Sequence, residues 1–250
     1  MAEPSNKTIL LMDVEKSGGR RDTEQAVVRH MLYAVLHETL SAASIEPTEY
    51  RSEDRGDGVF VLIDPSVPKP ALLRALLTTA PERLASNNRL ASEAAQIRLR
   101  IVVHTGEVAL DDFGAVGGDV VHAFRLLDST ALREALLTTP EPSVLCVSEA
   151  VYQGVVHHAH PGVRPEHFHP LAVDSKEGVT LTGWYHDSSV MRNINAPGKP
   201  RPGSVRRDIP GPPPSAPTLH ANTGNFFFGT AHFGGDSVAG DKHVGRGTDR

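Results

Sequence analysis

Two apolar runs of this chain each adjoin an aspartate, and together they restrict the possible folds more than any other feature. Residues 8–12 read Thr-Ile-Leu-Leu-Met and end at Asp13, and the run at 59–63 follows the turn Gly56-Asp57-Gly58. Short apolar runs bounded by turn residues are typical of buried strands. The Asp-Gly step predicts a β-hairpin over residues 50–63. A strand-end carboxylate and a hairpin-tip carboxylate converge if the two strands are neighbours in one sheet.

Two convergent carboxylates are candidate ligands for a hard cation. Mg²⁺ takes oxygen ligands and commonly shares one or two carboxylates with the phosphates of a substrate. Asp13 and Asp57 therefore predict a site for a metal and a nucleotide. The alternative is that Asp57 is only a turn residue, because Asp-Gly favours a hairpin turn without any functional requirement.

The rest of the first 187 residues predicts alternating helices and strands. Three segments are expected to be helical. The first carries apolar residues at three- and four-residue spacing from Val28 to Leu40 and could be capped at Asp22 or Thr23, and the others are 68–90, with a break near Pro81, and 120–136. Strands are expected at 97–104, 144–147, 168–173 and 179–185. Ser148 is placed to cap a helix that begins at Glu149. The order β-α-β-β-α-β, with additions, predicts an α/β (α+β) domain of ferredoxin-like arrangement.

Composition excludes some classes of function. The net charge of −5 argues against a dedicated nucleic-acid binder, which would carry a basic face. No apolar stretch approaches the roughly 18 residues of a membrane span, and the N-terminus lacks the apolar core of a signal peptide. The only cysteine, Cys146, lies in an apolar run and is expected to be a buried structural thiol. These features favour a cytoplasmic protein with no membrane and no nucleic-acid partner.

The composition changes near residue 188. Residues 188–221 are rich in proline and glycine, and this predicts a disordered linker. Residues 222–245 carry three adjacent phenylalanines, Phe226 to Phe228, among glycines and small polar residues. Such a segment is a candidate for cross-β self-assembly and faintly resembles short amyloid-type signalling motifs. The alternative is a tail that packs its phenylalanines on the domain.

Four motifs in order carry a resemblance to a known family. They are Ile9-Leu-Leu-Met-Asp-Val14, the hairpin Glu53-x-x-Gly-Asp-Gly58, the strand Arg98-Leu-Arg-Ile-Val-Val-His-Thr-Gly-Glu-Val108, and Val116-Gly-x-x-Val-x-x-Ala-x-Arg-Leu126. Together they resemble the class III nucleotidyl (adenylate/guanylate) cyclase catalytic domain, most of all its divergent actinomycete type. The resemblance covers residues 7–187. It implies a reaction in which a nucleoside triphosphate becomes a 3′,5′-cyclic nucleotide and pyrophosphate.

The resemblance also implies roles for individual residues. Asp13 and Asp57 match the aspartates that hold two Mg²⁺ or Mn²⁺ ions. The loop after Asp13, with Gly18 and Gly19, matches the segment whose backbone amides bind phosphates. Arg125 matches the arginine that stabilises charge at the α-phosphate. In the family the active sites form in a head-to-tail homodimer, with the aspartates from one subunit and the arginine from the other.

One lysine and the positions that contact the nucleotide base match the family pattern less completely. Lys176 lies near the family's second phosphate-binding lysine. Glu53 occupies a base-reading position at which glutamate accompanies guanine, so GTP is the favoured substrate. Val121 stands where the family has a ribose-orienting asparagine, and Gly114 stands at the second base-reading position. These two departures keep open the alternative of a catalytically weak or inactive nucleotide sensor that signals through the tail.

A group of histidines between residues 157 and 169 invites a metal-binding interpretation. Zinc sites need convergent ligands at fixed local spacing. Prolines and a glycine interrupt this stretch, which predicts a surface loop rather than a metal site.

Overall fold

The computed structural model describes residues 3–174 and 180–187. Lys176, the linker at 188–221 and the segment at 222–245 lie outside the described residues. The predictions made for them therefore stay predictions.

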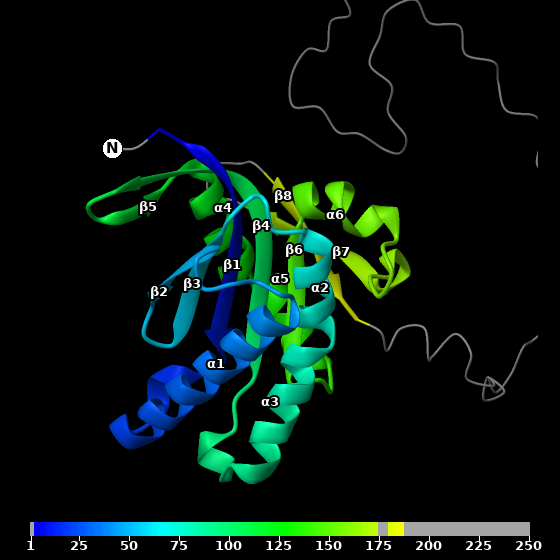
Figure 1. The fold of residues 1–250 in the computed structure, drawn as a ribbon. Helices are drawn as coiled ribbons and strands as arrows, with labels where there is room; N and C mark the ends of the chain where they lie inside the picture. Colours follow the sequence, from blue (N-terminus) through cyan, green and yellow to red (C-terminus); the bar gives the residue numbers. More distant parts are fainter. Residues whose placement is uncertain (1–2, 175–179, 188–250) are drawn as a thin grey trace, which may run out of the picture. The chain divides into compact units, whose positions relative to one another are not determined.

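A mixed β-sheet forms the centre of the domain (Figure 1). Its strand order is β2-β3-β1-β4-β6-β8-β7, and the short strand β5 pairs with β4. All pairings are antiparallel except that of β4 with β6. The strand bounds are β1 Ser5–Val14, β2 Tyr50–Asp54, β3 Gly58–Ile63, β4 Leu99–Asp111, β5 Gly114–Val116, β6 Ser143–Ser148, β7 Phe168–Asp174 and β8 Thr180–His186.

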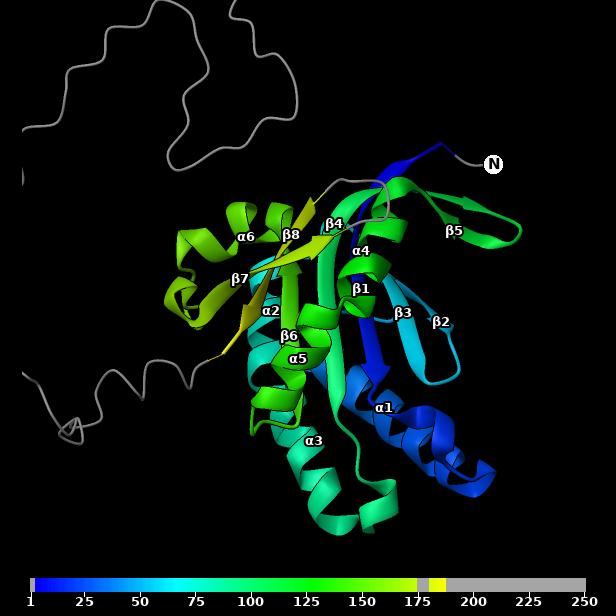
Figure 2. The ribbon, with the colours of Figure 1, turned by 180° about the vertical axis from the view of Figure 1, so that it is seen from behind.

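Helices cover both faces of the sheet. One group lies in front of it in Figure 1, and a second group lies on the opposite face, seen in Figure 2. The front helices are α1 Asp22–Ala42, α2 Lys69–Leu77 and α3 Thr79–Leu90, and the short α6 Glu149–Gly154 packs into the same core. The opposite face carries α4 Gly118–Asp128 and α5 Thr130–Thr138. The single-turn 3₁₀ helices are Ser17–Gly19, Glu93–Ala95, Val156–His158 and Pro165–His167.

Strand β1 contributes to two separate cores because its side chains alternate between the two faces. Leu10 and Met12 face α1 to α3, whereas Ile9 and Leu11 face α4 and α5. A strand buried on both faces reads as a continuous apolar run, which explains the pattern before Asp13. Cys146 is fully buried in the second core, and burial raises the pKa of its thiol to about 12.

The α+β arrangement predicted from the sequence is confirmed, and two helix boundaries differ. The helix expected at 120–136 is two helices, because Ser129 adopts an extended conformation between α4 and α5. Its hydroxyl donates to the Leu126 carbonyl oxygen at 2.8 Å and accepts from the Leu132 amide at 3.2 Å, so it satisfies both helix ends. The break expected near Pro81 lies at Thr78, and Pro81 lies in the first turn of α3, where proline costs no hydrogen bond.

None of the helices in the described part of the chain combines the length and the hydropathy required to cross a bilayer.

The double role of Ser129 predicts a specific cost for its removal. Ser129→Ala should lower the free energy of unfolding by about 1–2 kcal/mol, since both hydrogen bonds of a buried cap are lost. Thr130→Ala, one residue further on at an exposed position, is the matched control and should change stability by less than about 0.5 kcal/mol. Urea unfolding of both variants measures the difference. Equal stabilities would contradict the capping role.

Candidate active site

The pairing of β1 with β3 brings the two predicted metal ligands to one end of the sheet. Asp13 lies opposite Gly58 in the register, and the Val14 amide donates to the Asp57 backbone carbonyl at 3.0 Å. Asp57 occupies the exposed tip of the hairpin, whereas Asp13 is half-buried at the strand end. The two carboxylates are near enough that the charge of Asp57 contributes to raising the pKa of Asp13.

Asp13 is paired with an arginine that the sequence did not assign to the site. Burial raises the pKa of Asp13 above its usual value, and the opposing effect of the Arg100 guanidinium only partly offsets this. Arg100 extends from β4, donates to Asp13 Oδ2, and also donates to the Leu127 carbonyl oxygen near the end of α4 at 3.2 Å. Without a bound cation, the Arg100 guanidinium therefore partly neutralises Asp13.

The loop after Asp13 shapes a pocket beside the hairpin tip. Lys16 takes a left-handed conformation, and the 3₁₀ turn Ser17–Gly19 follows it. The Ser17 hydroxyl donates to Asp57 Oδ2 and joins the loop to the hairpin. No atom lies within 4 Å of the place where a side chain on Gly18 or Gly19 would begin, so this backbone is open to an approaching ligand.

The pocket itself has a volume of about 520 Å³, within the range of small-molecule sites. Its wall is formed by the loop, the hairpin tip and the first turns of α1, which supply Ser17, Gly18, Arg20, Asp22, Gln25, Ala26, Val28, Arg29, Gly56 and Asp57. A helix N-terminus and two arginines favour an anion, while Asp57 favours a cation. The pocket therefore offers complementary groups to an anion that carries a divalent metal.

The two base-reading positions lie next to each other. A side chain built on Gly114 would begin 3.5 Å from both carboxylate oxygens of Glu53. Glu53 Oε2 accepts from Arg55 at 3.2 Å, and Oε1 lies 3.5 Å from an Arg51 nitrogen. Oε1 is buried and has no hydrogen-bond donor among the described residues. One oxygen of Glu53 therefore retains the capacity to accept a hydrogen bond.

Arg55 also packs on aromatic rings. Its guanidinium lies 5.5 Å from the centre of the Phe60 ring and 5.6 Å from that of Phe124, and the two rings stack with centres 5.9 Å apart. This cation–π contact fixes Arg55 beside Glu53.

Arg125 and Val121 lie on α4 and are not among the residues that line the pocket. Arg125 is half-buried in the last turn of the helix, and Val121 is 49% exposed. Neither these two nor Glu53 belongs to the wall around Asp57. The structure thus places Asp13, Asp57 and Gly18 near one another, with Gly19 in the same 3₁₀ turn as Gly18. Glu53 and Gly114 form a separate pair of neighbours.

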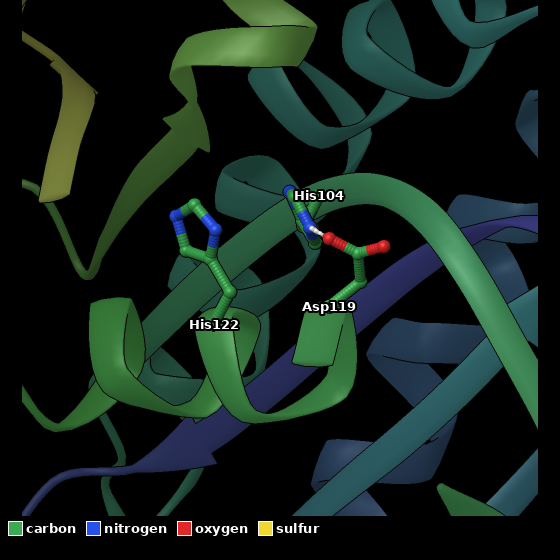
Figure 3. Close-up of side chains that lie close together, drawn as sticks. All are labelled: His104, Asp119 and His122. Carbon is green, nitrogen blue, oxygen red and sulfur yellow. Dashed lines mark hydrogen bonds and ion pairs between the residues drawn. The ribbon is translucent and has the colours of Figure 1, made fainter. Parts of the chain in front are cut away.

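A third group of polar side chains joins β4 to α4 (Figure 3). His104 is 2% exposed, and its Nε2 lies 3.1 Å from Asp119 Oδ1 while its Nδ1 lies 2.8 Å from the Ser148 hydroxyl. Asp119 Oδ2 accepts from the Glu107 amide at 2.7 Å. The His122 ring lies beside His104, with ring centres 4.5 Å apart. Burial lowers the pKa of both histidines, so each ring is neutral at pH 7.

The sequence matches no protein-family profile and no curated protein. The structure is similar to solved nucleotidyl cyclases. The guanylyl cyclase Cya2 matches with a TM-score of 0.50 at 16% identity, over 74% of this chain and 94% of that one. Two structures of a bacterial light-regulated adenylyl cyclase match with TM-scores of 0.51 and 0.54, at 12% and 17% identity. They align with 74% and 75% of this chain and with 92% and 54% of their own.

This domain has the nucleotidyl cyclase fold. The similarity extends over about three-quarters of the chain, which corresponds to the described domain. At these identities the similarity establishes the fold alone, and the roles of individual residues stay predictions.

Sequence reasoning missed Arg100, Ser17 and the His104 group in this cyclase fold. One signal was available. Residues 100, 102 and 104 share one face of β4 by their two-residue period, and two of the three are polar on a face that α4 and α5 cover. Asp119 and His122 are three residues apart and therefore neighbours on one helix face. Polar residues on two covered faces indicate contact between those faces.

The Arg100–Asp13 pair predicts a measurable coupling in this domain. Arg100→Gln should lower the free energy of unfolding by roughly 3 kcal/mol, because it leaves a largely buried carboxylate without its partner. Combining it with Asp13→Asn should cost less than the sum of the single changes by roughly 1–3 kcal/mol. Arg133→Gln is the control, since its pair with Asp128 is exposed, and it should cost less than about 1 kcal/mol. Additive single effects in urea unfolding would contradict the pairing.

Proposed function

We propose that this protein is a metal-dependent nucleotidyl cyclase that acts in cytoplasmic signalling. It converts a purine nucleoside triphosphate, preferentially GTP, into a 3′,5′-cyclic nucleotide and pyrophosphate. The observation that carries the proposal is the convergence of Asp13 and Asp57 at one end of the sheet, beside a pocket that Asp57 lines together with Gly18 and the start of α1.

The donor set at this edge fits Mg²⁺ or Mn²⁺. Both ligands are carboxylates, which hard cations prefer, and the Ser17 hydroxyl and the loop carbonyl groups add further oxygen atoms nearby. Asp13 and Asp57 would hold two ions, and these ions would lower the pKa of the ribose 3′-hydroxyl and bind the leaving pyrophosphate. Arg100 holds Asp13 in position until a cation competes for it.

The remaining residues bind and orient the substrate. In the reaction the 3′-oxygen forms a bond to the α-phosphorus, the bond from that phosphorus to the bridging oxygen breaks, and the 3′-proton passes to solvent. Backbone amides at Gly18 and Gly19 bind phosphate oxygens, and Arg125 neutralises charge on the α-phosphate. Lys176 is proposed as a second phosphate contact. Glu53 Oε1, which is buried without a donor, accepts an N–H of guanine.

We further propose that the active site forms between two copies of the chain arranged head to tail. Glu53 and Arg125 lie outside the wall of the pocket that contains Asp57, an arrangement compatible with their serving the site of the other subunit. The same region presents apolar side chains to solvent: Phe113, at the β4–β5 turn, is 98% exposed, and Val121 is 49% exposed. A second copy that covers them would bury this surface.

A nucleotide sensor without turnover is the second candidate. Two features of the chain favour it. Val121 has no group that can orient a ribose, and Arg51 and Arg55 already partly neutralise Glu53. In this alternative, nucleotide binding would be transmitted through self-assembly of residues 222–245.

The first experiment measures product and binding together. Purified full-length protein is incubated with each of four NTPs and Mn²⁺, and cyclic product is detected by mass spectrometry. Asp57→Asn should reduce product formation by about 100-fold and abolish metal-dependent nucleotide binding in calorimetry, because an amide is a poor ligand for a hard cation. Asp112→Asn, at an exposed turn, is the control and should behave as the wild type.

The outcomes separate the two candidates. Binding without product in the wild type supports the sensor. Unchanged nucleotide affinity in Asp57→Asn contradicts the site itself.

The second experiment tests the dimer. Asp57→Asn and Arg125→Gln should each be inactive alone, and a mixture should recover activity because each mixed dimer contains one intact site. Light scattering or native mass spectrometry checks that mixed dimers form. Mixed dimers without activity would show that both residues serve the same subunit.

A further inference from the structure

Three side chains that the proposed cyclase reaction does not use converge where α4 meets β4 (Figure 3). They are His104 from the strand and Asp119 and His122 from the helix. One ligand atom from each residue lies within 4.8 Å of the others. We propose that this group binds one divalent transition-metal ion of the Zn²⁺ class, at a site separate from Asp13 and Asp57.

The donor types select the class of metal. Two imidazoles and one carboxylate form a donor set that zinc binds in proteins, commonly with a water as the fourth ligand. Mg²⁺ prefers all-oxygen sites and is a poor fit here. The pair Asp13 and Asp57 has the opposite preference, so the two sites would take different ions from the same solution.

The burial of the three groups suits an ion that enters from solvent. His104 is 2% exposed and forms the base of the site, whereas Asp119 and His122 are only partly buried. This leaves room at the outer side for a water ligand. Gly106 allows Asp119 to approach the strand. A side chain at this position would collide with the Asp119 carboxylate and push it away from β4.

The groups behind the ligands are already in place. Ser148 contacts His104 Nδ1, and the Glu107 amide holds the second oxygen of Asp119. In the metal-free protein, a proton on His104 Nε2 joins the ring to Asp119. A metal ion takes the place of that proton, and the ring then carries its proton on Nδ1, where the Ser148 oxygen accepts it. Such partners orient metal-binding histidines in known sites.

One ring nitrogen of His122 lacks a hydrogen-bond partner in the metal-free protein. Its Nε2 atom is shielded from solvent and has no hydrogen-bond partner among the described residues. A buried polar atom without a partner costs stability. In Figure 3 the ring nitrogen of His122 that faces His104 is Nδ1, so this atom is the one that would bind the ion, and Nε2 lies on the far side of the ring.

The test uses the full chain and Zn²⁺ alone, without nucleotide, so its result does not depend on the proposed cyclase activity. Calorimetry in the presence of excess Mg²⁺ should give one Zn²⁺ per chain. Replacement of the ion by Co²⁺ should produce visible absorption bands typical of nitrogen and oxygen coordination. His122→Gln and Asp119→Asn should each weaken Zn²⁺ binding by at least about tenfold.

The control addresses the other histidines of the chain. His160→Gln, in the loop after α6, removes an imidazole outside the site and should leave Zn²⁺ affinity unchanged. Circular dichroism checks that each variant is folded, and His122→Gln is the primary variant because its side chain is only partly buried. The proposal is overturned if the wild type binds no Zn²⁺, if excess Mg²⁺ displaces it, or if His122→Gln and Asp119→Asn bind it as the wild type does.

Discussion

Strand β1 is hydrogen-bonded to β3 on one side and to β4 on the other, and its side chains from Thr8 to Met12 are buried on both faces. A one-residue slip in either pairing would exchange the two faces, so two cores fix the register of this strand. The position of Asp13 follows from that register, because it is the residue at which the strand leaves the apolar interior. The hairpin tip with Asp57 is placed by the same pairing. The proposed chemistry therefore depends on the packing of a strand that contains only one functional residue.

Each carboxylate of the proposed active site is associated with a neighbouring group from the chain. Asp13 has Arg100, Asp57 has the Ser17 hydroxyl, and Glu53 has Arg51 and Arg55. Burying a carboxylate without a partner is costly, so these contacts stabilise the ligand-free protein. A metal ion or a guanine must compete with them. The affinity of the site is thus a difference between two sets of contacts.

The sequence was informative where structure is local. The two-residue period, the Asp-Gly turn and the Ser148 cap predicted the strands, the hairpin and the start of α6, and the cap is confirmed by a hydrogen bond from the Val151 amide. It was uninformative where residues distant in the chain meet. Nothing local indicates that Arg100 contacts Asp13, 87 positions away, and the contact of His104 with Asp119 is indicated only when the polar faces of β4 and α4 are considered together. The division of the 120–136 helix was missed because the apolar period continues through Ser129, and only the conformation of that residue interrupts it.

Helix α4 joins groups that lie far apart in the sequence. In the first turns of α4, Asp119 and His122 contact His104 of β4. Near the end of α4, Leu127 accepts a hydrogen bond from Arg100, the partner of Asp13. If α4 moves as a rigid unit, a displacement at one end is transmitted to the other. If an ion at the first turn shifts this helix and so changes nucleotide affinity, nucleotide must change the affinity for that ion by the same factor. The proposed zinc site and the proposed Asp13–Asp57 site would then be energetically coupled through helix α4.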